Sequence, residues 1–384
     1  LVTSTFEYLP GLPVYHSKDL VHWRHIGNAL SRESQLTFPG RKSSKAIFAP
    51  TIRCQPDAFY IINTDVEGIG NFVINAKDPA GPWSDPVRIP EPEFGMDPSL
   101  LFDDDGTVYY TRHGGLRNGG AYQAIIDLKT GKLKEPAKEI WKGMGGVWPE
   151  GPHLYKINGW YYLMIAEGGT SYEHRITMAR SRSPWGPFEP HPDNPLLTHM
   201  NRPDALFQAL GHADLVSTPE GNWWITLLGI RSQKVEGKGS HHHIGRETLL
   251  APVKWRADGW PEIGQNRELP QPQPTTGLPG WHPWPAEAVR ETFSAKKPLA
   301  LHWSFVRTYA TGQWSLTDKP GSLRLLGSKT GLESLEATPT FIGRRQTHLN
   351  QRFTTEVNFS PKDAGDAAGV ALRMNETHHL LLGI

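Results

Sequence analysis

The sequence predicts an all-β protein in which a five-bladed β-propeller is followed by a β-sandwich. Two observations predict this architecture: a repeat with a period of about 50 residues over the first two thirds of the chain, and a Pro-rich stretch between that repeat and a region of alternating strands. Helical periodicity is nearly absent. We expect the propeller over residues 1–265, a linker over 266–289 and a partial sandwich over 290–384.

The repeat consists of units with one layout. Each has a small or polar head, a short apolar strand, a turn, and an aromatic, β-branched strand. Three of the turns contain glycine, at 104–106, 158–159 and 220–221. The units cover residues 48–68, 96–115, 149–169 and 211–231. Their heads, spaced by 48, 53 and 62 residues, are Ala49, Asp97, Glu150 and His212. Units of this length with about four short strands are typical of propeller blades.

The first blade fits the repeat in part. "LVTSTFEYLPG" (1–11) aligns with the second strand of the other units, so no residue of this sequence matches the first strand of that blade. Both termini are apolar, whereas chain ends are commonly polar and frayed. We therefore expect both ends of the chain to be cut inside strands.

The stretch "ELPQPQPTTGLPGWHPWP" (268–285) predicts the linker, because proline lacks the N–H that helices and inner strands require. After it, three segments alternate apolar and polar residues as sandwich strands do. They are 301–307, 321–327 and 351–375.

Composition excludes several functions. A net charge of +1 argues against a nucleic-acid-binding surface, and no apolar run approaches the ~18 residues of a membrane span. Cys54 is the only cysteine, so no intrachain disulfide can form. The sequence leaves the cellular compartment open.

The heads of the units predict a site. The innermost strand of each propeller blade lines the central channel, so Asp97, Glu150 and His212 should converge at one end of it. Any one of these heads alone would be ordinary turn chemistry. Their recurrence in register favours a site with two carboxylates and a histidine.

Several segments resemble glycoside hydrolase family 43, in particular its β-xylosidase branch with a C-terminal β-sandwich. They are "STFEYLPGLPVYHSKDLVHW" (4–23), "GMDPSLLFDDDG" (95–106), "PEGPHLYKINGWYYLMIAEGGTSYEH" (149–174), "GHADLV" (211–216) and "GRETLLAPVKW" (245–255). The resemblance implies an inverting exo-glycosidase that releases D-xylose from the non-reducing end of xylo-oligosaccharides. An α-L-arabinofuranosidase on arabinoxylan side chains and a non-catalytic sugar-binding propeller are the alternatives.

The resemblance also implies roles for the heads. Glu150 resembles the general acid, and Asp97 resembles the aspartate that raises the pKa of that acid and orients it. Arg246 resembles the arginine that binds a sugar hydroxyl and touches the aspartate. His212 resembles a channel histidine near a bound calcium ion or water. No cofactor is obligatory by this resemblance, and one Ca²⁺ in the channel is compatible with it, as is a homo-oligomer.

A second group of residues is expected around the substrate. Phe6, Phe48 and Thr170 resemble residues of the xylose-binding subsite. Trp148 is either a sugar platform or a packing residue, and His174 either lines the pocket or caps a loop. The run "HHH" at 241–243 is expected to border the site beside Arg246 rather than to bind a metal, because neighbours in an extended chain point to opposite faces.

Physical chemistry supports the role of Glu150. An inverting glycosidase needs one protonated carboxyl and one ionised carboxylate. A glutamate in water has a pKa of ~4.3, and a general acid needs a pKa of about 6–7. Burial and the negative charge of Asp97 would both raise the pKa of Glu150.

One part of the family pattern has no match. The family's general base is an aspartate on the first strand of the first blade. By the repeat, its position would precede Leu1. The 384-residue chain is therefore expected to be a poor or inactive hydrolase although it carries the acid.

Overall fold

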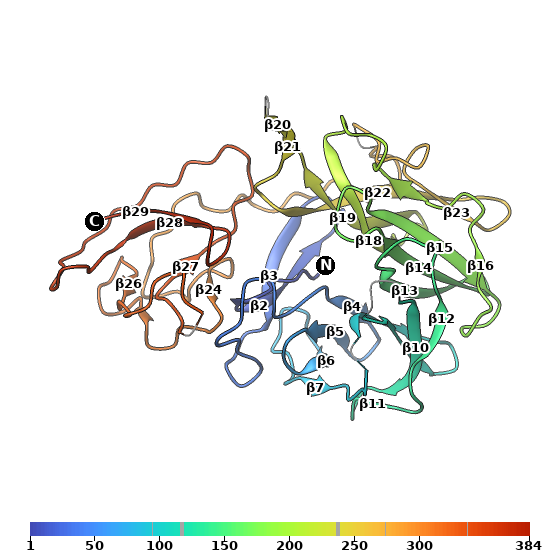
Figure 1. Ribbon diagram of the computed structural model, residues 1–384, viewed down its shortest axis with the longest axis horizontal. Helices are drawn as coiled ribbons and strands as arrows, with labels where there is room; N and C mark the ends of the chain where they lie inside the picture. The colour runs from blue at the N-terminus through green and yellow to red at the C-terminus, as the bar shows by residue number, and fades with distance from the viewer. Residues whose placement is uncertain (94, 116–118, 236–238, 273, 336) are drawn as a thin grey trace.

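The computed structural model describes residues 1–384 except 94, 116–118, 236–238, 273 and 336. Its described residues contain strands, turns and loops and no α-helix. A membrane-crossing helix is accordingly not found among them. Figure 1 shows sheets arranged around an axis, with the C-terminal segment to one side of them. The predicted all-β propeller is confirmed.

The blades follow one another along the chain. Blade I contains β2 (Gly11–Ser17) and β3 (Trp23–Leu30). Blade II contains β4 (Thr51–Cys54), β5 (Phe59–Asp65), β6 (Gly70–Ala76) and β7 (Val87–Arg88). Blade III contains β8 (Met96–Phe102), β9 (Val108–His113), β10 (Ala121–Asp127), β11 (Lys132–Leu133) and β12 (Lys138–Trp141).

The last two blades are built in the same way. Blade IV contains β13 (Glu150–Ile157), β14 (Trp160–Glu167), β15 (Arg175–Ser181), β16 (Glu189–Pro190) and β17 (Leu197–Thr198). Blade V contains β18 (Phe207–Ser217), β19 (Trp223–Arg231), β22 (Arg246–Trp255) and β23 (Pro261–Ile263). A separate hairpin of β20 (Gln233–Val235) and β21 (Gly239–His241) stands out between β19 and β22 (Figure 1).

Local sequence explains the blade hairpins. Asn158 and Gly159 connect β13 to β14 and have φ of 51° and 74°. Two successive positive φ angles are what a two-residue hairpin turn needs to match the twist of its strands. Asparagine and glycine adopt them at low cost, so the predicted turn forms as expected.

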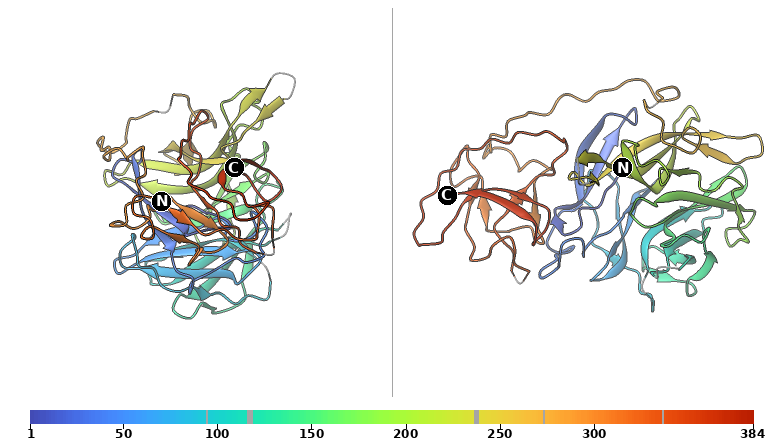
Figure 2. Two further views of the ribbon diagram at one scale, coloured as in Figure 1. Left: turned by 90° about the vertical axis from the view of Figure 1, so that its left-hand side faces the viewer. Right: turned by 45° about the horizontal axis from the view of Figure 1, so that its top comes forward.

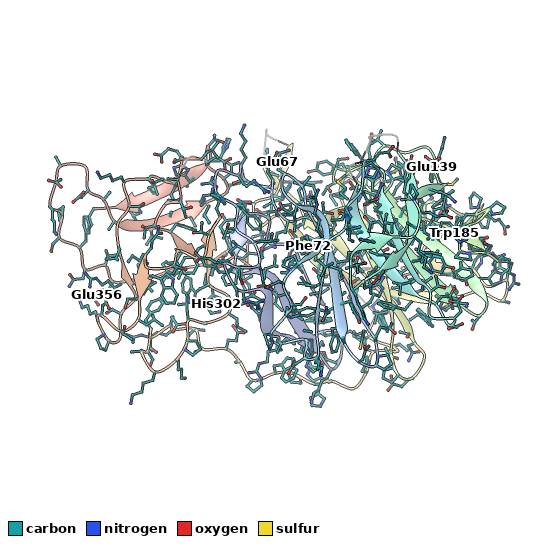
Figure 3. The ribbon with its side chains drawn as sticks, turned by 90° about the horizontal axis from the view of Figure 1, so that it is seen from below. Glu67, Phe72, Glu139, Trp185, His302 and Glu356 are labelled. Carbon is teal, nitrogen blue, oxygen red and sulfur yellow. The ribbon has the colours of Figure 1, made fainter. Side chains whose placement is uncertain are left out.

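The hydrophobic core lies between the blades. Among the described residues, clusters of buried side chains join blades I and II, II and III, III and IV, and IV and V. Phe72 of β6 is fully buried in the first of these clusters and lies inside the propeller in Figure 3. Burying a side chain of this kind contributes about 1.5–3 kcal/mol, so packing between neighbouring blades holds the ring in place.

Residues 1–3 are the edge of blade I. The backbone of Leu1 exchanges hydrogen bonds with Tyr15, and Val2 bridges Val14 on β2. Leu1, Val2 and Thr3 also line the large cavity that holds the site described below. This segment therefore pairs with β2 on one side and borders the cavity.

The C-terminal segment contains small sheets and shares one of them with the propeller. β24 (Ser304–Val306) pairs with β27 (Ile342–Gly343) and with β1 (Tyr8–Leu9), whose residues come from the start of the chain. β25 (Trp314–Ser315) pairs with β26 (Arg324–Leu325), and β28 (Gly369–Arg373) pairs with β29 (His379–Gly383). The views in Figure 2 show this segment against blade I. The sequence did not predict the pairing of β1 with β24.

Candidate active site

The backbone departs from regular strand geometry at two of the predicted site residues, Asp97 and His212. Asp97 near the start of β8 and His212 within β18 have φ of 51° and 50°, values that non-glycine residues seldom adopt. The strand register shifts between Met96 and Ser99, and again on both sides of Gly211. Such bulges re-aim side chains and recur beside active sites. The heads of blades III and V therefore depart from regular strand geometry where the site forms.

Asp97 and His212 form a buried pair. Nε2 of His212 lies 3.3 Å from Oδ2 of Asp97, and the N–H of Gly151 donates to the same carboxylate. Burial would raise the pKa of Asp97, but His212 and these hydrogen bonds outweigh it, so the pKa is lowered. Burial likewise disfavours protonated His212, yet the negative charge of Asp97 raises the pKa of the imidazole. Asp97 is thus held as a carboxylate.

A glycine lets the histidine approach the acid. Gly151 has a φ of 57°, and a Cβ at this position would lie 2.8 Å from Cε1 of His212. Any larger residue would push the imidazole away. The sequence Pro149-Glu150-Gly151 is therefore explained by the close approach of blade V to the start of β13.

Glu150 has the proton affinity that an acid catalyst needs. It is the first residue of β13, its side chain is 12% exposed, and it lines the cavity. Burial raises the pKa of Glu150, and the charge of Asp97 raises it further, to about 7. Two carboxyl groups from neighbouring blades are thus driven apart in pKa, so one stays protonated near neutrality while the other is ionised.

His174 lies behind Glu150 and not on the cavity wall. It is fully buried, and burial lowers its pKa to about 3, so the ring is neutral. Its Nδ1–H donates to the carbonyl of Ala209, 3.0 Å away, which leaves Nε2 without a proton. This Nε2 has no hydrogen-bond partner and lies 3.8 Å from Oε1 of Glu150. The buried, neutral ring of His174 is therefore part of the packing behind the carboxyl group of Glu150.

Aromatic side chains build one wall of the site. The rings of Phe6 and Phe48 meet edge to face with centroids 5.8 Å apart, and Cζ of Arg246 lies 5.1 Å from the centre of the Phe6 ring. All three residues line the cavity, as do exposed Thr170 and the exposed histidines 242 and 243. Arg246 lies more than 4.0 Å from both carboxylates, so the expected contact with Asp97 is not made in this structure.

Trp148 packs against the loop that carries the acid. Its ring meets His113 edge to face at 6.0 Å and lies beside Gly169, where a Cβ would be 3.1 Å from the indole. Trp148 has a φ of 53°, and its carbonyl accepts the N–H of Glu150 at 2.8 Å. Trp148 thus packs beside His113 and Gly169 at the turn before Glu150, and its contact with a sugar stays a prediction.

A polar network in the channel was not anticipated from the sequence. The guanidinium of Arg53 on β4 contacts Asp214 at 2.8 Å, Nδ1 of His153 at 3.0 Å and the carbonyl of Leu100 at 3.1 Å. The hydroxyl of Tyr155 donates to Asp214 at 2.6 Å. These residues come from blades II, III, IV and V, so the network ties together the strands that present the acid and its partner. A signal was present: Asp214 and His153 follow the heads His212 and Glu150 by two and three positions.

The calcium ion that the resemblance allows stays a prediction. In this structure Nε2 of His212 faces Asp97, whose charge favours a protonated ring, and such a ring has no lone pair for a cation. Among the described residues, no group of three or more His, Cys, Asp or Glu side chains is arranged to hold a metal. Calcium therefore stays a prediction, and no step below depends on it.

The site pairs a carboxyl group whose pKa is about 7 with a carboxylate whose pKa is lowered. Such a pair is suited to protonating the leaving oxygen of a glycosidic bond. The protein is a glycoside hydrolase. Residues 1–261 match the family described as "Glycosyl hydrolases family 43", and residues 290–384 match the "Beta xylosidase C-terminal Concanavalin A-like domain". The chain belongs to glycoside hydrolase family 43, and its propeller is followed by a β-sandwich domain.

Relatives and solved structures agree with this assignment. The chain is 47% identical over 383 residues to "Non-reducing end alpha-L-arabinofuranosidase BoGH43B" of Bacteroides ovatus, covering 99% of this chain and 70% of that protein. It is 43% identical to a "Xylosidase/arabinosidase" of Butyrivibrio fibrisolvens, covering 100% of this chain and 75% of that protein. The crystal structure of a xylan beta-1,4-xylosidase from Bacillus halodurans superposes with a TM-score of 0.89 at 34% identity, covering all of this chain and 74% of that one.

Proposed function

We propose that this protein is an inverting exo-glycosidase that removes D-xylose from the non-reducing end of xylo-oligosaccharides. Glu150 donates its proton to the leaving oxygen, and Asp97, held as an anion by His212, keeps that proton on Glu150 until substrate arrives. The observation that carries the proposal is the pKa of about 7 at Glu150 beside a carboxylate whose pKa is lowered. The terminal sugar would lie against Phe6 and Phe48, with Arg246 on one of its hydroxyls.

A second candidate function is α-L-arabinofuranosidase activity on arabinoxylan side chains. It is favoured by the printed name of the Bacteroides ovatus relative, and two further relatives are named for both sugars. A terminal arabinofuranose and a terminal xylose present similar hydroxyl groups. One acid and one aromatic wall would serve both sugars.

A direct comparison of two aryl glycosides tests the sugar. We expect nitrophenyl β-D-xyloside and nitrophenyl α-L-arabinofuranoside both to be hydrolysed, with a higher kcat/KM for the xyloside. Nitrophenyl β-D-glucoside, which adds a hydroxymethyl group to the xyloside, is the control and should be the poorest of the three. A higher kcat/KM for the arabinofuranoside would transfer the proposal to the second candidate, and a preference for the glucoside would contradict both.

The residue that deprotonates the attacking water is assigned to no position of this sequence. Asp97 is unsuited, because its carboxylate is buried and already accepts from Gly151 and His212. A missing general base costs about 10²–10⁴ in rate. We therefore expect slow hydrolysis by the 384-residue chain, and acceleration by azide, an anion that attacks without losing a proton.

The azide experiment needs one control. In the Glu150→Gln variant of the same chain, azide should give less acceleration with xylobiose, whose leaving oxygen still needs a proton. A glycosyl azide should appear among the products of the unmodified chain. Rapid hydrolysis of xylobiose without azide, and no azide product, would show that a carboxylate of this chain serves as base.

A further inference from the structure

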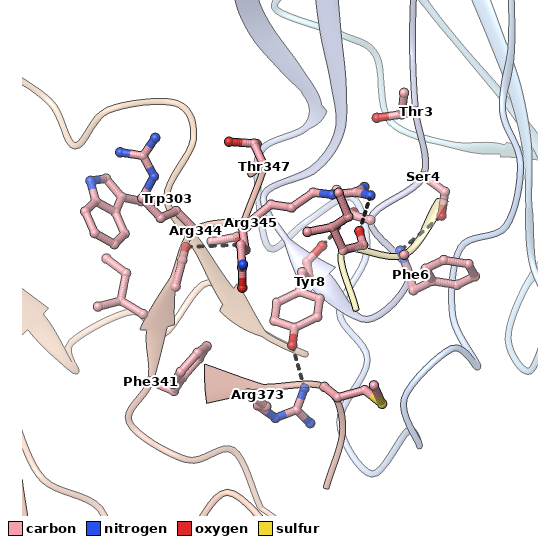
Figure 4. A pocket seen from close by; sticks show the side chains of 18 of the residues that line it. Thr3, Ser4, Phe6, Tyr8, Trp303, Phe341, Arg344, Arg345, Thr347 and Arg373 are labelled. Carbon is pink, nitrogen blue, oxygen red and sulfur yellow. Dashed lines mark hydrogen bonds between the residues drawn. The ribbon is translucent and has the colours of Figure 1, made fainter. Parts of the chain in front are cut away.

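We propose that the C-terminal domain positions the Phe6–Arg246 wall of the active site through two arginines, Arg345 and Arg373. This proposal rests on the proposed function, because that wall is where the terminal sugar would bind. Arg345 and Arg373 touch neither Glu150 nor Asp97 and are positioning residues. Figure 4 shows both of them between the C-terminal domain and the segment of the propeller that carries Phe6.

The first anchor holds the turn that carries Phe6. The guanidinium of Arg373, whose side chain is 1% exposed, donates to the hydroxyl of Tyr8 at 2.6 Å and lies 3.5 Å from Oε1 of Glu7. Oε2 of Glu7 accepts the N–H of Ser44 at 2.9 Å. Tyr8 begins β1, which is itself paired with β24 of the C-terminal domain. The residues that follow Phe6 are thus held by backbone pairing and by a buried ion pair.

The same anchor reaches the segment that leads to Phe48. The hydroxyl of Ser43 donates to Glu376 at 2.6 Å, and Glu376 lies 3.6 Å from Arg373. Arg307 of the C-terminal domain is fully buried and donates through Nε to the carbonyl of Arg41 at 2.6 Å. The C-terminal domain therefore holds both the segment that follows Phe6 and the segment that precedes Phe48.

The second anchor holds the loop that carries Arg246. One nitrogen of the Arg345 guanidinium donates to the carbonyl of Ile244 at 3.1 Å and also to the carbonyl of Arg246 itself. These are charge-assisted bonds to backbone, which are stronger than neutral ones. β22 begins at Arg246, so the bond fixes the chain at the point where this side chain turns toward the cavity.

The two anchors meet at a single contact. Phe6 comes from the start of the chain and Arg246 from blade V, yet their side chains stack at 5.1 Å. Arg345 and Arg373 belong to one domain, so the domain sets the position of one partner relative to the other. A loss of either anchor would let the stack open and weaken sugar binding, while Glu150, Asp97 and His212 stay in place on the propeller.

The kinetic test uses Arg345→Ala and Arg373→Lys in the full chain. Arg345→Ala removes the anchor of the Arg246 loop, and Arg373→Lys keeps a positive charge against Glu7 while losing the forked geometry. We expect each variant to raise KM for nitrophenyl β-D-xyloside about tenfold, with kcat nearly unchanged. A tenfold change is within the range of interaction energies between residues in contact. Arg324→Ala is the matched control, because Arg324 lies in the same domain and pairs only with exposed Asp318 among the described residues. It should leave both constants unchanged.

A double-mutant cycle then tests the route. In a Phe6→Ala background, Arg345→Ala should add little to KM, because the stack that it holds is already gone. Additive effects of Phe6→Ala and Arg345→Ala on KM would overturn the proposal, and so would a fall in kcat with KM unchanged.

A substrate-independent measurement separates this proposal from the proposed function. Amide hydrogen exchange should become faster over residues 4–8 in Arg373→Lys and over 242–248 in Arg345→Ala, with blades III and IV unchanged. Unchanged exchange in both segments would overturn the anchoring. Faster exchange there, in a protein that hydrolyses neither the xyloside nor the arabinofuranoside, would uphold the anchoring and contradict the proposed function instead.

Discussion

Glu150→Gln is expected to lower kcat/KM for xylobiose by about 10²–10⁴, the range that general acid catalysis contributes. The amide keeps the size of the side chain and its place at the start of β13, but it has no proton to give. The loss should be much smaller on nitrophenyl β-D-xyloside, because nitrophenolate leaves without being protonated. Kinetics on the two substrates, in a form of the protein that hydrolyses both, measure the difference.

The control for this substitution is Glu262→Gln, which changes an exposed glutamate at the outer edge of blade V in the same way. It should leave both rates unchanged. Equal losses on xylobiose and on the nitrophenyl xyloside in Glu150→Gln would remove Glu150 from the role of acid, because loss of an acid cannot affect a leaving group that needs none.

Asp97→Asn is expected to move the alkaline limb of the pH–rate profile to lower pH and to reduce the rate. Glu150 must be protonated to act, so activity falls as the pH rises through its pKa of about 7. Burial is the larger cause of that raised pKa and Asp97 the next, so removing the anion lowers the pKa without restoring the value in water. A shift of one unit corresponds to ~1.36 kcal/mol and to about a tenfold lower rate above the limb.

His212 responds to the same substitution. Without Asp97 the imidazole loses the charge that raises its pKa, and a neutral ring no longer opposes the protonation of Glu150. Because Asp97 acts on Glu150 more strongly than His212 does, the net shift is still toward lower pH. The measurement is kcat/KM for xylobiose, whose leaving oxygen needs the proton of Glu150, from pH 4 to 9. A limb that stays in place would show that burial, and not the charge of Asp97, sets the pKa of Glu150.

Much of the propeller could be predicted because its signals are local. The alternation of apolar and polar residues, the Asn158-Gly159 turn and the period of about 50 residues each depend on neighbours in the chain. The register of the repeat was enough to place Asp97, Glu150 and His212 in one site. The pairing of β1 with β24 in a sheet of the C-terminal domain was less predictable, because the two strands lie about 300 residues apart in the chain.

The sequence by itself determined the family and the blades, and it was enough to predict Glu150 as the acid and Asp97 as its partner, since these predictions follow from patterns that short stretches carry. The tertiary structure alone decided the environment of those groups. It places Trp148 against His113, His174 behind Glu150, and the guanidinium of Arg53 against residues of three other blades. A pKa depends on burial and on charges from several strands, and a positioning contact depends on two segments that only folding brings together. Neither the pKa nor the positioning contact can be read from the residues that neighbour it in the chain.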